Sequence, residues 1–458
     1  MVRTRILAEL ERRMALFPHE VLRLEAAARA DDRGLGIHAS QVSVLKILMD
    51  ELLQRQHDFL ARLQQTLSDA EFADGASALL FEEMSGAQRI WSVFSRAFAD
   101  RQRVETAVDL DTADLVAADC YLLCTGRARN WGVLDADGLR EPPLVCLEAY
   151  PEAIAVGRHD PLGSLCDAGW RFHDLRLPIP LVLLPADQIG CVWLLPPLCH
   201  EVGHDVDKDL GLSAELTSAL AGADGGIAPA RRQAWQRWTA EILADVFGVL
   251  LGNVGFARAV AALLLLLAFG RRCVELDVLV SHPHPLLRLY LVASMLRRLG
   301  LPALVEAAAQ LEDEARTVPA PDGIAPYLED VDAVTGVFLA TRLRGLGGHS
   351  LSELNPELAA DVKRAQLLAE YLASGELRPS PDQPARFPYR LVPAAAQLAV
   401  TAASRGTAAQ LAAVQQRATE FVAAIPRPPF LEGGARLTSR RAAFLARLAR
   451  EMKLGKGS

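Results

Sequence analysis

The first hundred residues carry an apolar pattern with the period of a helix. The pattern runs through residues 1 to about 105 and breaks at residues 31–34. In the second segment apolar side chains recur at steps of four and three residues, with the polar Gln56 among them, at Leu45, Met49, Leu52, Phe59 and Leu63. Such spacing places one apolar stripe along a helix. We therefore predict a long antiparallel helical hairpin or small bundle over residues 1–110.

Between residues 110 and 195 the pattern changes to short, β-rich apolar runs bounded by prolines. The runs cover residues 144–147, 153–156 and 181–184, and the last of them stands between Pro180 and Pro185. Short runs of this kind are typical of strands, because proline is tolerated at their ends but not within a central strand. We predict a small sheet, and the pattern leaves open which run is its edge strand.

The stretch 198–204 follows this sheet and contains His200, Glu201 and His204. On a helix, residues four apart lie one above the other, so both imidazoles can reach one zinc ion at ~2.0–2.1 Å. Glu201, a step round the helix, then lies beside the open coordination position, where it can accept a proton from water. Pro196 and Pro197 suit a first helical turn, so we predict a helix that starts there and ends near Gly211.

A second predicted helix, over residues 238–248, places Glu241 and Asp245 on one face. Zinc held by two histidines still lacks a third protein ligand, and a ligating histidine usually donates its second nitrogen to a carboxylate. This helix can supply both groups. Its core-facing side is predicted to be Trp235, Trp238, Ile242 and Val246.

The order of these residues resembles the gluzincin clan of zinc metallopeptidases, the thermolysin-like arrangement. The resemblance lies in His-Glu-x-x-His followed by a helix with Glu-x-x-x-Asp. It implies that His200, His204 and Glu241 are the zinc ligands and that Glu201 is the general base. It also implies that Asp245 orients His200.

Residues 281–289 are similar to the His-Pro-x-x-x-x-Arg element of the CAAX-prenyl endopeptidase branch of that clan. His282, Pro283 and Arg288 match it. The resemblance implies that a histidine here, His282 rather than His284, either takes the fourth zinc position in a latent state or stabilises the oxyanion. The alternative is that both histidines only cap the next helix. For Arg288, a salt bridge that anchors the segment and a contact with substrate stay equally open.

Beyond residue 300 the chain is again helical and rich in alanine. One helix is marked by Asn355 as cap, Pro356 at its first position and Gly375 at its end. We predict a C-terminal helical domain over residues 301–458. Nearer the motif, Asp205, Asp207 and Asp209 alternate without the glycine and glutamate that a calcium loop requires, so we predict a solvated acidic face.

Composition narrows the classes of function. A chain of 458 residues with 51% hydrophobic residues can build two or three domains without a metal or disulfide to hold them. The net charge is −8 and the basic residues are dispersed, so no nucleic-acid partner is expected. Seven cysteines without regular spacing indicate buried thiols in a reducing compartment.

The termini and the apolar runs favour a cytoplasmic protein. The N-terminal residues interleave charges with apolar side chains, unlike a signal peptide. The longest apolar run covers residues 259–270, whereas a membrane span needs ~20 residues, so we predict a buried helix there and no membrane partner. This departs from the CAAX-prenyl branch, whose members are typically integral membrane proteins.

Taken together, these patterns predict an α+β, predominantly α fold with helical domains on either side of a core at residues 111–300, and the resemblance implies that this core is a zincin-like metallopeptidase. The expected activity is Zn²⁺-dependent hydrolysis of peptide bonds in a protein or peptide, with Glu201 activating water. The alternative is a catalytically silent zinc-fold scaffold that acts through its helical flanks, although the intact Glu201 argues against it. The flanks are candidates for packing, for sensing, and for contact with a second copy or a regulatory protein.

Overall fold

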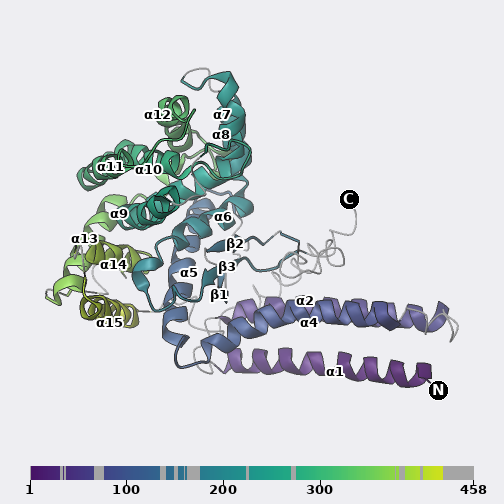
Figure 1. The fold of residues 1–458 in the computed structure, drawn as a ribbon. Helices are drawn as coiled ribbons and strands as arrows, with labels where there is room; N and C mark the ends of the chain where they lie inside the picture. The colour runs from purple at the N-terminus through teal and green to yellow at the C-terminus, as the bar shows by residue number, and fades with distance from the viewer. Residues whose placement is uncertain are drawn as a thin grey trace. The chain divides into compact units, whose positions relative to one another are not determined.

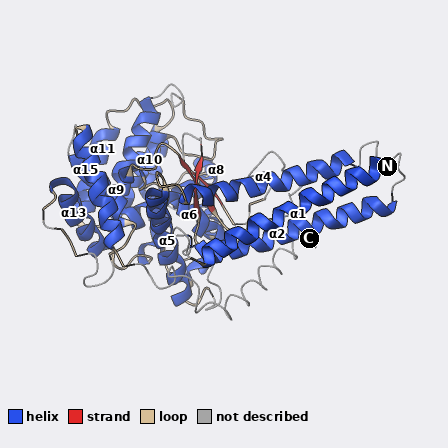
Figure 2. Cartoon of the chain, turned by 90° about the horizontal axis from the view of Figure 1, so that it is seen from below, coloured by secondary structure: helices blue, strands red, loops and turns tan. Residues whose placement is uncertain are grey.

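The computed structural model describes residues 2–30, 35, 38–66, 77–134, 141–148, 153–158, 160–161, 176–222, 226–269, 275–376, 378–380, 387–402 and 406–426. These residues are mostly helical, with one three-stranded sheet (Figure 1, Figure 2), as predicted. They divide into two compact units. The described part of the first lies within residues 1–107 and 157–180, and that of the second within residues 108–156 and 181–426.

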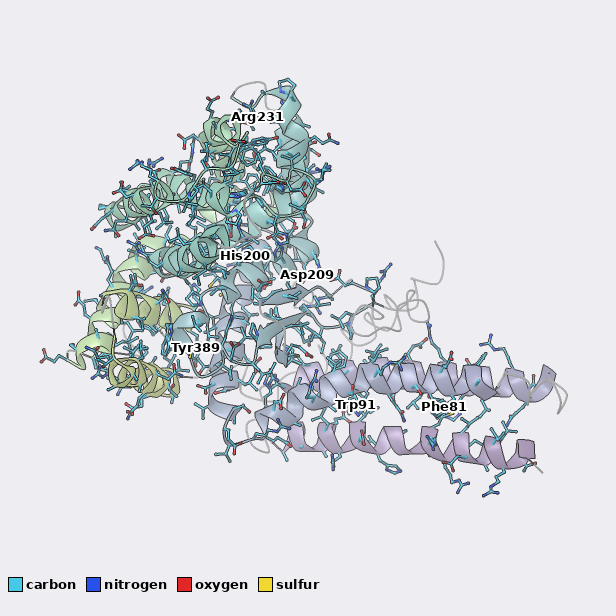
Figure 3. All side chains as sticks on the ribbon, viewed as in Figure 1. Phe81, Trp91, His200, Asp209, Arg231 and Tyr389 are labelled. Atoms are coloured by element: carbon cyan, nitrogen blue, oxygen red, sulfur yellow. The ribbon has the colours of Figure 1, made fainter. Side chains whose placement is uncertain are left out.

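Three long helices make up most of the first unit: α1 (Val2–Arg29), α2 (Ala39–Thr66) and α4 (Ser77–Arg101). Each contributes to one apolar cluster, which contains Leu10, Met14, Leu60 and Met84. The indole of Trp91 on α4, labelled in Figure 3, donates to the Glu20 carboxylate on α1 at 2.6 Å. The first hundred residues thus form a small helical bundle, and the apolar stripe predicted on α2 is buried at Leu45, Met49 and Leu52. The predicted break at residues 31–34 and the Leu63 side chain lie outside the described residues.

The sheet belongs to the second unit and consists of the three predicted runs. Its strands are β1 (Leu144–Glu148), β2 (Ile154–Val156) and β3 (Leu181–Pro185), in the order β1-β3-β2. β1 runs parallel to β3 with Leu144 opposite Leu181, and β2 runs antiparallel to β3 with Ala155 opposite Val182. β2 is therefore an edge strand, and it packs against the helix that carries the histidine motif.

The helices of the second unit surround one long central helix, α9 (Thr239–Phe269), which packs against α6, α10 and α14. Trp235, Trp238, Ile242 and Val246 are buried, which confirms their predicted core position. The other helices are α5 (Ala107–Asn130), α6 (Leu198–Leu210), α7 (Leu212–Ala221), α8 (Pro229–Arg237), α10 (Pro285–Leu299), α11 (Pro302–Ala315), α12 (Ala325–Ala340), α13 (Leu358–Ser374), α14 (Leu391–Ala402) and α15 (Ala408–Ala424), with short 3-10 turns η4 (Val192–Leu194), η5 (Arg344–Leu346) and η6 (Leu351–Glu353).

α6 has the predicted boundaries. Pro197 immediately precedes its first residue, where a missing N–H costs no helical hydrogen bond. Gly211 follows its last residue with φ 70°, a left-handed conformation that glycine adopts without steric cost.

α9 is longer than the pattern predicted. The helix expected to end near Gly248 continues to Phe269 and includes most of the run that was predicted as a separate buried helix. Asn253 interrupts it with φ 47° and ψ −134°, so two helical halves meet at a kink. By length and composition alone, residues 239–267 of α9 could cross a membrane, and 67% of its most apolar window is buried inside the protein.

The C-terminal helices belong to the same compact unit as the motif helix, which differs from the predicted division at residue 300. Buried Arg390, just before α14, explains this because it donates to Asp119 of α5 at 2.9 Å and to Asp361 of α13 at 2.5 Å. Gly375 ends α13 as predicted. α13 begins at Leu358, two residues later than predicted, and the Asn355 side chain accepts from the Glu357 backbone N–H at 3.1 Å, as a cap does. The Asn355 amide also donates to the Leu250 carbonyl and to Asp361.

The predicted solvated acidic face after the motif is also wrong. Asp205 is 1% and Asp207 6% exposed. Asp207 accepts from the Ser213 backbone N–H, so it satisfies a donor at the start of α7, and Asp209 (Figure 3) accepts from the Tyr121 hydroxyl of α5. These carboxylates connect α6 to its neighbours rather than facing water.

Candidate metal centre

The motif helix α6 and the first half of α9 lie in direct backbone contact. Gly203, inside the histidine motif, makes this approach close, since a Cβ added there would lie 2.9 Å from the Phe247 Cβ and 3.2 Å from the Ala244 Cα. Any larger side chain at position 203 would push the helices apart. The contact brings α6 histidines within reach of α9 carboxylates that are about forty residues away in the sequence.

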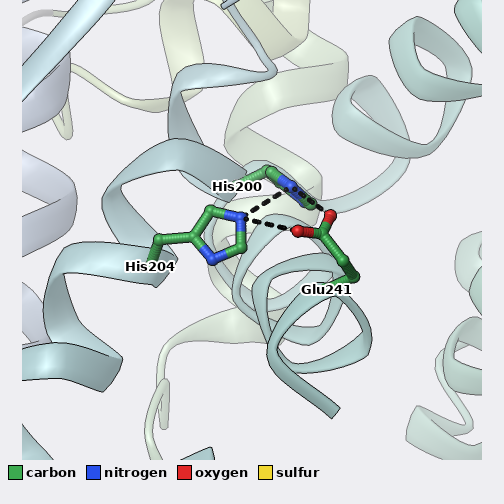
Figure 4. A group of neighbouring side chains, drawn as sticks. All are labelled: His200, His204 and Glu241. Atoms are coloured by element: carbon green, nitrogen blue, oxygen red, sulfur yellow. Dashed lines mark hydrogen bonds and ion pairs between the residues drawn. The ribbon is translucent and has the colours of Figure 1, made fainter. Parts of the chain in front are cut away.

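His200, His204 and Glu241 converge on one point, as Figure 4 shows. The two histidine Nε2 atoms are 3.2 Å apart. The Glu241 carboxylate oxygens lie 3.5 Å from Nε2 of His200 and 3.6 Å from Nε2 of His204. Donors bound at ~2.0–2.1 Å around a tetrahedral zinc ion are roughly 3.3–3.4 Å apart. The 3.5 Å and 3.6 Å separations belong to different oxygens of Glu241, and one donor atom from each residue lies within 4.8 Å of the others. This group could hold one metal ion such as zinc, and three protein ligands would leave a fourth position open.

Asp245 lies one turn beyond Glu241 and fixes the orientation of His200. Its Oδ1 is 2.9 Å from Nδ1 of His200, and the carboxylate is completely buried. Arg288 donates to the same carboxylate from the side, through Nε to Oδ2 at 3.0 Å and through a terminal nitrogen to Oδ1 at 2.7 Å. The arginine keeps the pKa of Asp245 well below its usual range, against the effect of burial, so Asp245 stays an acceptor. Nδ1 of His200 must then carry the proton, which leaves Nε2 free for a metal.

The protonation state of each side chain in the cluster determines whether it can bind a metal ion without first losing a proton. Burial, with the neighbouring His200, lowers the pKa of His204 to about 3, so His204 is neutral at pH 7. Burial would also lower the pKa of His200, but Asp245 and Glu241 outweigh it and raise that pKa to about 10. The pKa of Glu241 falls to about 2, since its contacts with the histidines outweigh burial. Metal binding must therefore displace a proton from His200.

Glu201 points into the same cavity as the cluster but is not one of its three ligands. The backbone N–H of Ala155, on edge strand β2, donates to its carboxylate. Burial raises the pKa of Glu201 to about 7, with the negative charge of Glu241 adding to the effect. A carboxylate with a pKa near neutrality is suited to accept and return a proton.

The two histidines of residues 282–284 have different environments. His284 is buried, and its Nδ1 accepts from the Leu286 backbone N–H at 3.2 Å, so it caps α10. His282 is 61% exposed at its side chain, and its Nε2 lies 3.3 Å from Oε1 of Glu241. The capping interpretation thus holds for His284, whereas His282 faces the metal cluster.

A cavity of about 760 Å³ opens at this cluster. Its polar end contains His200, Glu201, Glu241, His282 and Arg288. The remaining lining comes mainly from the second half of α9, with contributions from η4 and α14. A volume of this size is typical of sites that enclose most of a ligand.

The structure brings together every residue that the sequence singled out, namely His200, Glu201, His204, Glu241, Asp245, His282 and Arg288. In the structure, Arg288 forms a salt bridge with Asp245. Sequence reasoning missed Gly203, Ala155 and the contribution of the second half of α9 to the cavity. The glycine inside the motif was the one available signal among these, because a glycine within a helix is costly unless another chain segment must approach it.

Comparison with protein-family models, curated proteins and solved structures returned no match for this chain.

Proposed function

We propose that this protein is a zinc-dependent metallopeptidase of gluzincin type, with a zincin-like core in its second unit. The observation that carries the proposal is the triangle of His200, His204 and Glu241, whose donor atoms lie close enough together to hold one zinc ion. An acidic group beside that triangle, Glu201, adds the base that hydrolysis requires. The substrate would be a protein or a peptide.

Zinc, when bound, would supply the Lewis acidity that polarises the scissile carbonyl and acidifies water. Glu201 would take a proton from the attacking water and pass it to the leaving amine as the carbon–nitrogen bond breaks. Burial and the charge of Glu241 raise the pKa of Glu201, which favours its return of the proton to the leaving group. Asp245 and Arg288 would act only through His200, which they hold in one tautomer.

Metal analysis and a single variant test this proposal. The purified protein should contain about one zinc per chain. Glu201→Gln should keep that zinc and lose cleavage by ~10²–10⁴-fold, because the base is removed while the ligands remain. Glu306→Gln, at an exposed glutamate of α11, is the matched control and should change neither quantity.

The readout in cells is N-terminal profiling of the proteome with the parent or the Glu201→Gln variant. Protein N-termini that appear only with the parent would identify substrates. Zinc binding without any cleavage that depends on Glu201 would contradict the peptidase and favour the alternative, a silent scaffold that acts through its helices.

A further inference from the structure

The second half of α9 presents one apolar stripe to the cavity. The stripe consists of residues spaced three and four apart, which share a helix face: Phe256, Ala259, Val260, Leu263, Leu264 and Leu267. Phe256, Val260 and Leu264 are at most 4% exposed, whereas Leu263 is 39% exposed. The wall therefore combines buried core side chains with accessible apolar surface at Leu263.

Exposed apolar side chains gather at this cavity. Among the large apolar side chains exposed in the described part of the second unit, four line the cavity: Leu194, Leu263, Leu266 and Val280. They come from η4, from α9 and from the segment before α10, which are separate in the sequence. Apolar surface that several segments direct to one place usually serves binding.

The kink in α9 lets one helix contribute carboxylates at one end of the cavity and apolar side chains at the other. Asn253, at φ 47° and ψ −134°, separates the half with Glu241 and Asp245 from the half with the stripe. Phe256 folds back against the first half, since a Cβ on Gly248 would overlap its ring and one on Gly252 would lie 2.8 Å from its Cβ. The two halves are thus packed together, so the apolar wall is fixed relative to the ligands.

The length of the wall indicates its occupant. From Phe256 to Leu267 the helix rises about 16 Å at 1.5 Å per residue. An extended peptide, at about 3.3 Å per residue, would place about five residues along it. The cavity contains the hydrolytic groups at its other end, so a chain on the wall would reach them.

The charges that line the cavity favour a peptide over an anionic membrane surface as the occupant of the wall. Among the described lining residues the carboxylates are Glu201, Glu241, Glu275 and Asp277. Arg288 is the one lysine or arginine in that lining, and it is paired with Asp245. Anionic lipid attracts clusters of lysine and arginine, which this lining lacks.

We propose that the preferred substrate is a polypeptide segment with about five consecutive apolar residues, seated on the wall formed by residues 256–267. This specificity rests on the proposed peptidase function. Leu263 and Leu266 would contact the segment, and both are exposed enough that substitution leaves the fold intact.

Peptide binding to the zinc-loaded Glu201→Gln protein tests this without requiring turnover. Two labelled peptides would be identical except for a central run of five residues, either alternating leucine and valine or alternating serine and asparagine. Fluorescence anisotropy should show at least ~10-fold tighter binding of the apolar peptide. Leu263→Asn should remove most of that preference, Leu266→Asn a smaller part, and neither should alter binding of the polar peptide.

Leu367→Asn is the matched control, because Leu367 is 56% exposed on α13 and does not line the cavity. Equal binding of the two peptides, or a preference that survives Leu263→Asn, would overturn the proposal. Sedimentation with anionic phospholipid vesicles that depends on Leu263, together with equal peptide binding, would identify the wall as a membrane contact instead.

The same peptides separate this inference from the proposed function. If the parent protein cleaves both equally and cleavage depends on Glu201, the peptidase stands and the apolar specificity is wrong. If the apolar peptide binds preferentially but no peptide or protein is cleaved, the peptidase is wrong and the wall remains a peptide-binding surface.

Discussion

The two halves of α9 differ in how their side chains are held. In the first half, Glu241 and Asp245 are buried and each has several polar partners on other elements. The second half carries apolar side chains, apart from Arg258, which pairs with Glu314, and Leu263 and Leu266 on it are exposed. A buried charge is costly unless it is paired and hydrogen-bonded, whereas an apolar binding surface requires only side chains of complementary shape. One helix can therefore hold a rigid reactive centre and an open binding surface together.

The largest effect is expected in the first half, at Glu241. Glu241→Ala removes one of three ligands, so zinc content should fall below roughly a tenth of the parental value and cleavage should disappear. Metal analysis after gel filtration measures the first effect. Glu275→Ala, at an exposed acidic residue of the same cavity, should retain its zinc. Equal zinc loss in both variants would mean that the cavity attracts metal through its overall charge rather than through the triangle.

The next effect concerns His282, which faces the metal ligands from outside α9. Its Nε2 lies beside Glu241 but is not part of the ligand triangle, so we expect it to stabilise the oxyanion. His282→Ala should then reduce turnover by ~10²–10³-fold with zinc content unchanged. Steady-state cleavage of one peptide measures this. Higher basal cleavage in the variant would show instead that His282 blocks the fourth zinc position.

A smaller effect is expected at Asp245, which binds no metal itself. Asp245→Asn keeps the shape of the side chain but removes the charge that Arg288 and His200 share. Zinc affinity or cleavage should fall by about 10–100-fold. Competition with a chromogenic chelator measures the affinity, and the melting temperature monitors the buried Arg288. Unchanged zinc affinity with lowered stability would restrict Asp245 to a structural role.

Gly203→Ala should weaken the contact between α6 and the first half of α9. The added methyl meets Phe247 and Ala244, so the free energy of unfolding should fall by about 1–3 kcal/mol. Urea unfolding measures it. Gly126→Ala on α5, where no atom lies within 4 Å of the added carbon, should instead be neutral or slightly stabilising. Equal behaviour of the two variants would mean that the helices can separate freely.

The smallest effect is expected for Asn253→Gly, at the position where the two halves meet. Its positive φ favours glycine, so Asn253→Gly should preserve the kink and stabilise the protein by up to about 1 kcal/mol. Asn253→Ala should destabilise it by about 1–3 kcal/mol. Urea midpoints measure both. Stabilisation by alanine would show that the kink is not required and that a straight α9 is accessible.

The pairing of the clustered residues within each helix was predictable because it depends on local geometry. Residues four apart share a helix face whatever surrounds them, so His200 with His204, and Glu241 with Asp245, could be paired from the sequence. The three strands and the ends of α6 were predictable for the same reason, since proline and glycine act on their own backbone.

The features that could not be predicted involve residues whose contacts are distant in the sequence. Asp205 and Asp207 were expected in water but are buried, and the Leu250 carbonyl that the Asn355 amide contacts is 105 residues away in the sequence. The continuation of α9 beyond Gly248 was missed because the strained Asn253 is stabilised by packing that no local pattern reports. Leu263 was predicted as core, yet it faces the cavity.

The glycine contact between α6 and α9 also bears on which cation the site accepts. Position 203 already carries the smallest residue, so substitution can widen the ligand triangle but cannot narrow it. Calcium takes six to eight oxygen ligands at about 2.3–2.6 Å, and two imidazoles on closely packed helices offer neither that number nor that distance. Under the proposed function, a preference for a small divalent ion such as zinc would therefore come from the close packing of two helices as well as from the ligands themselves.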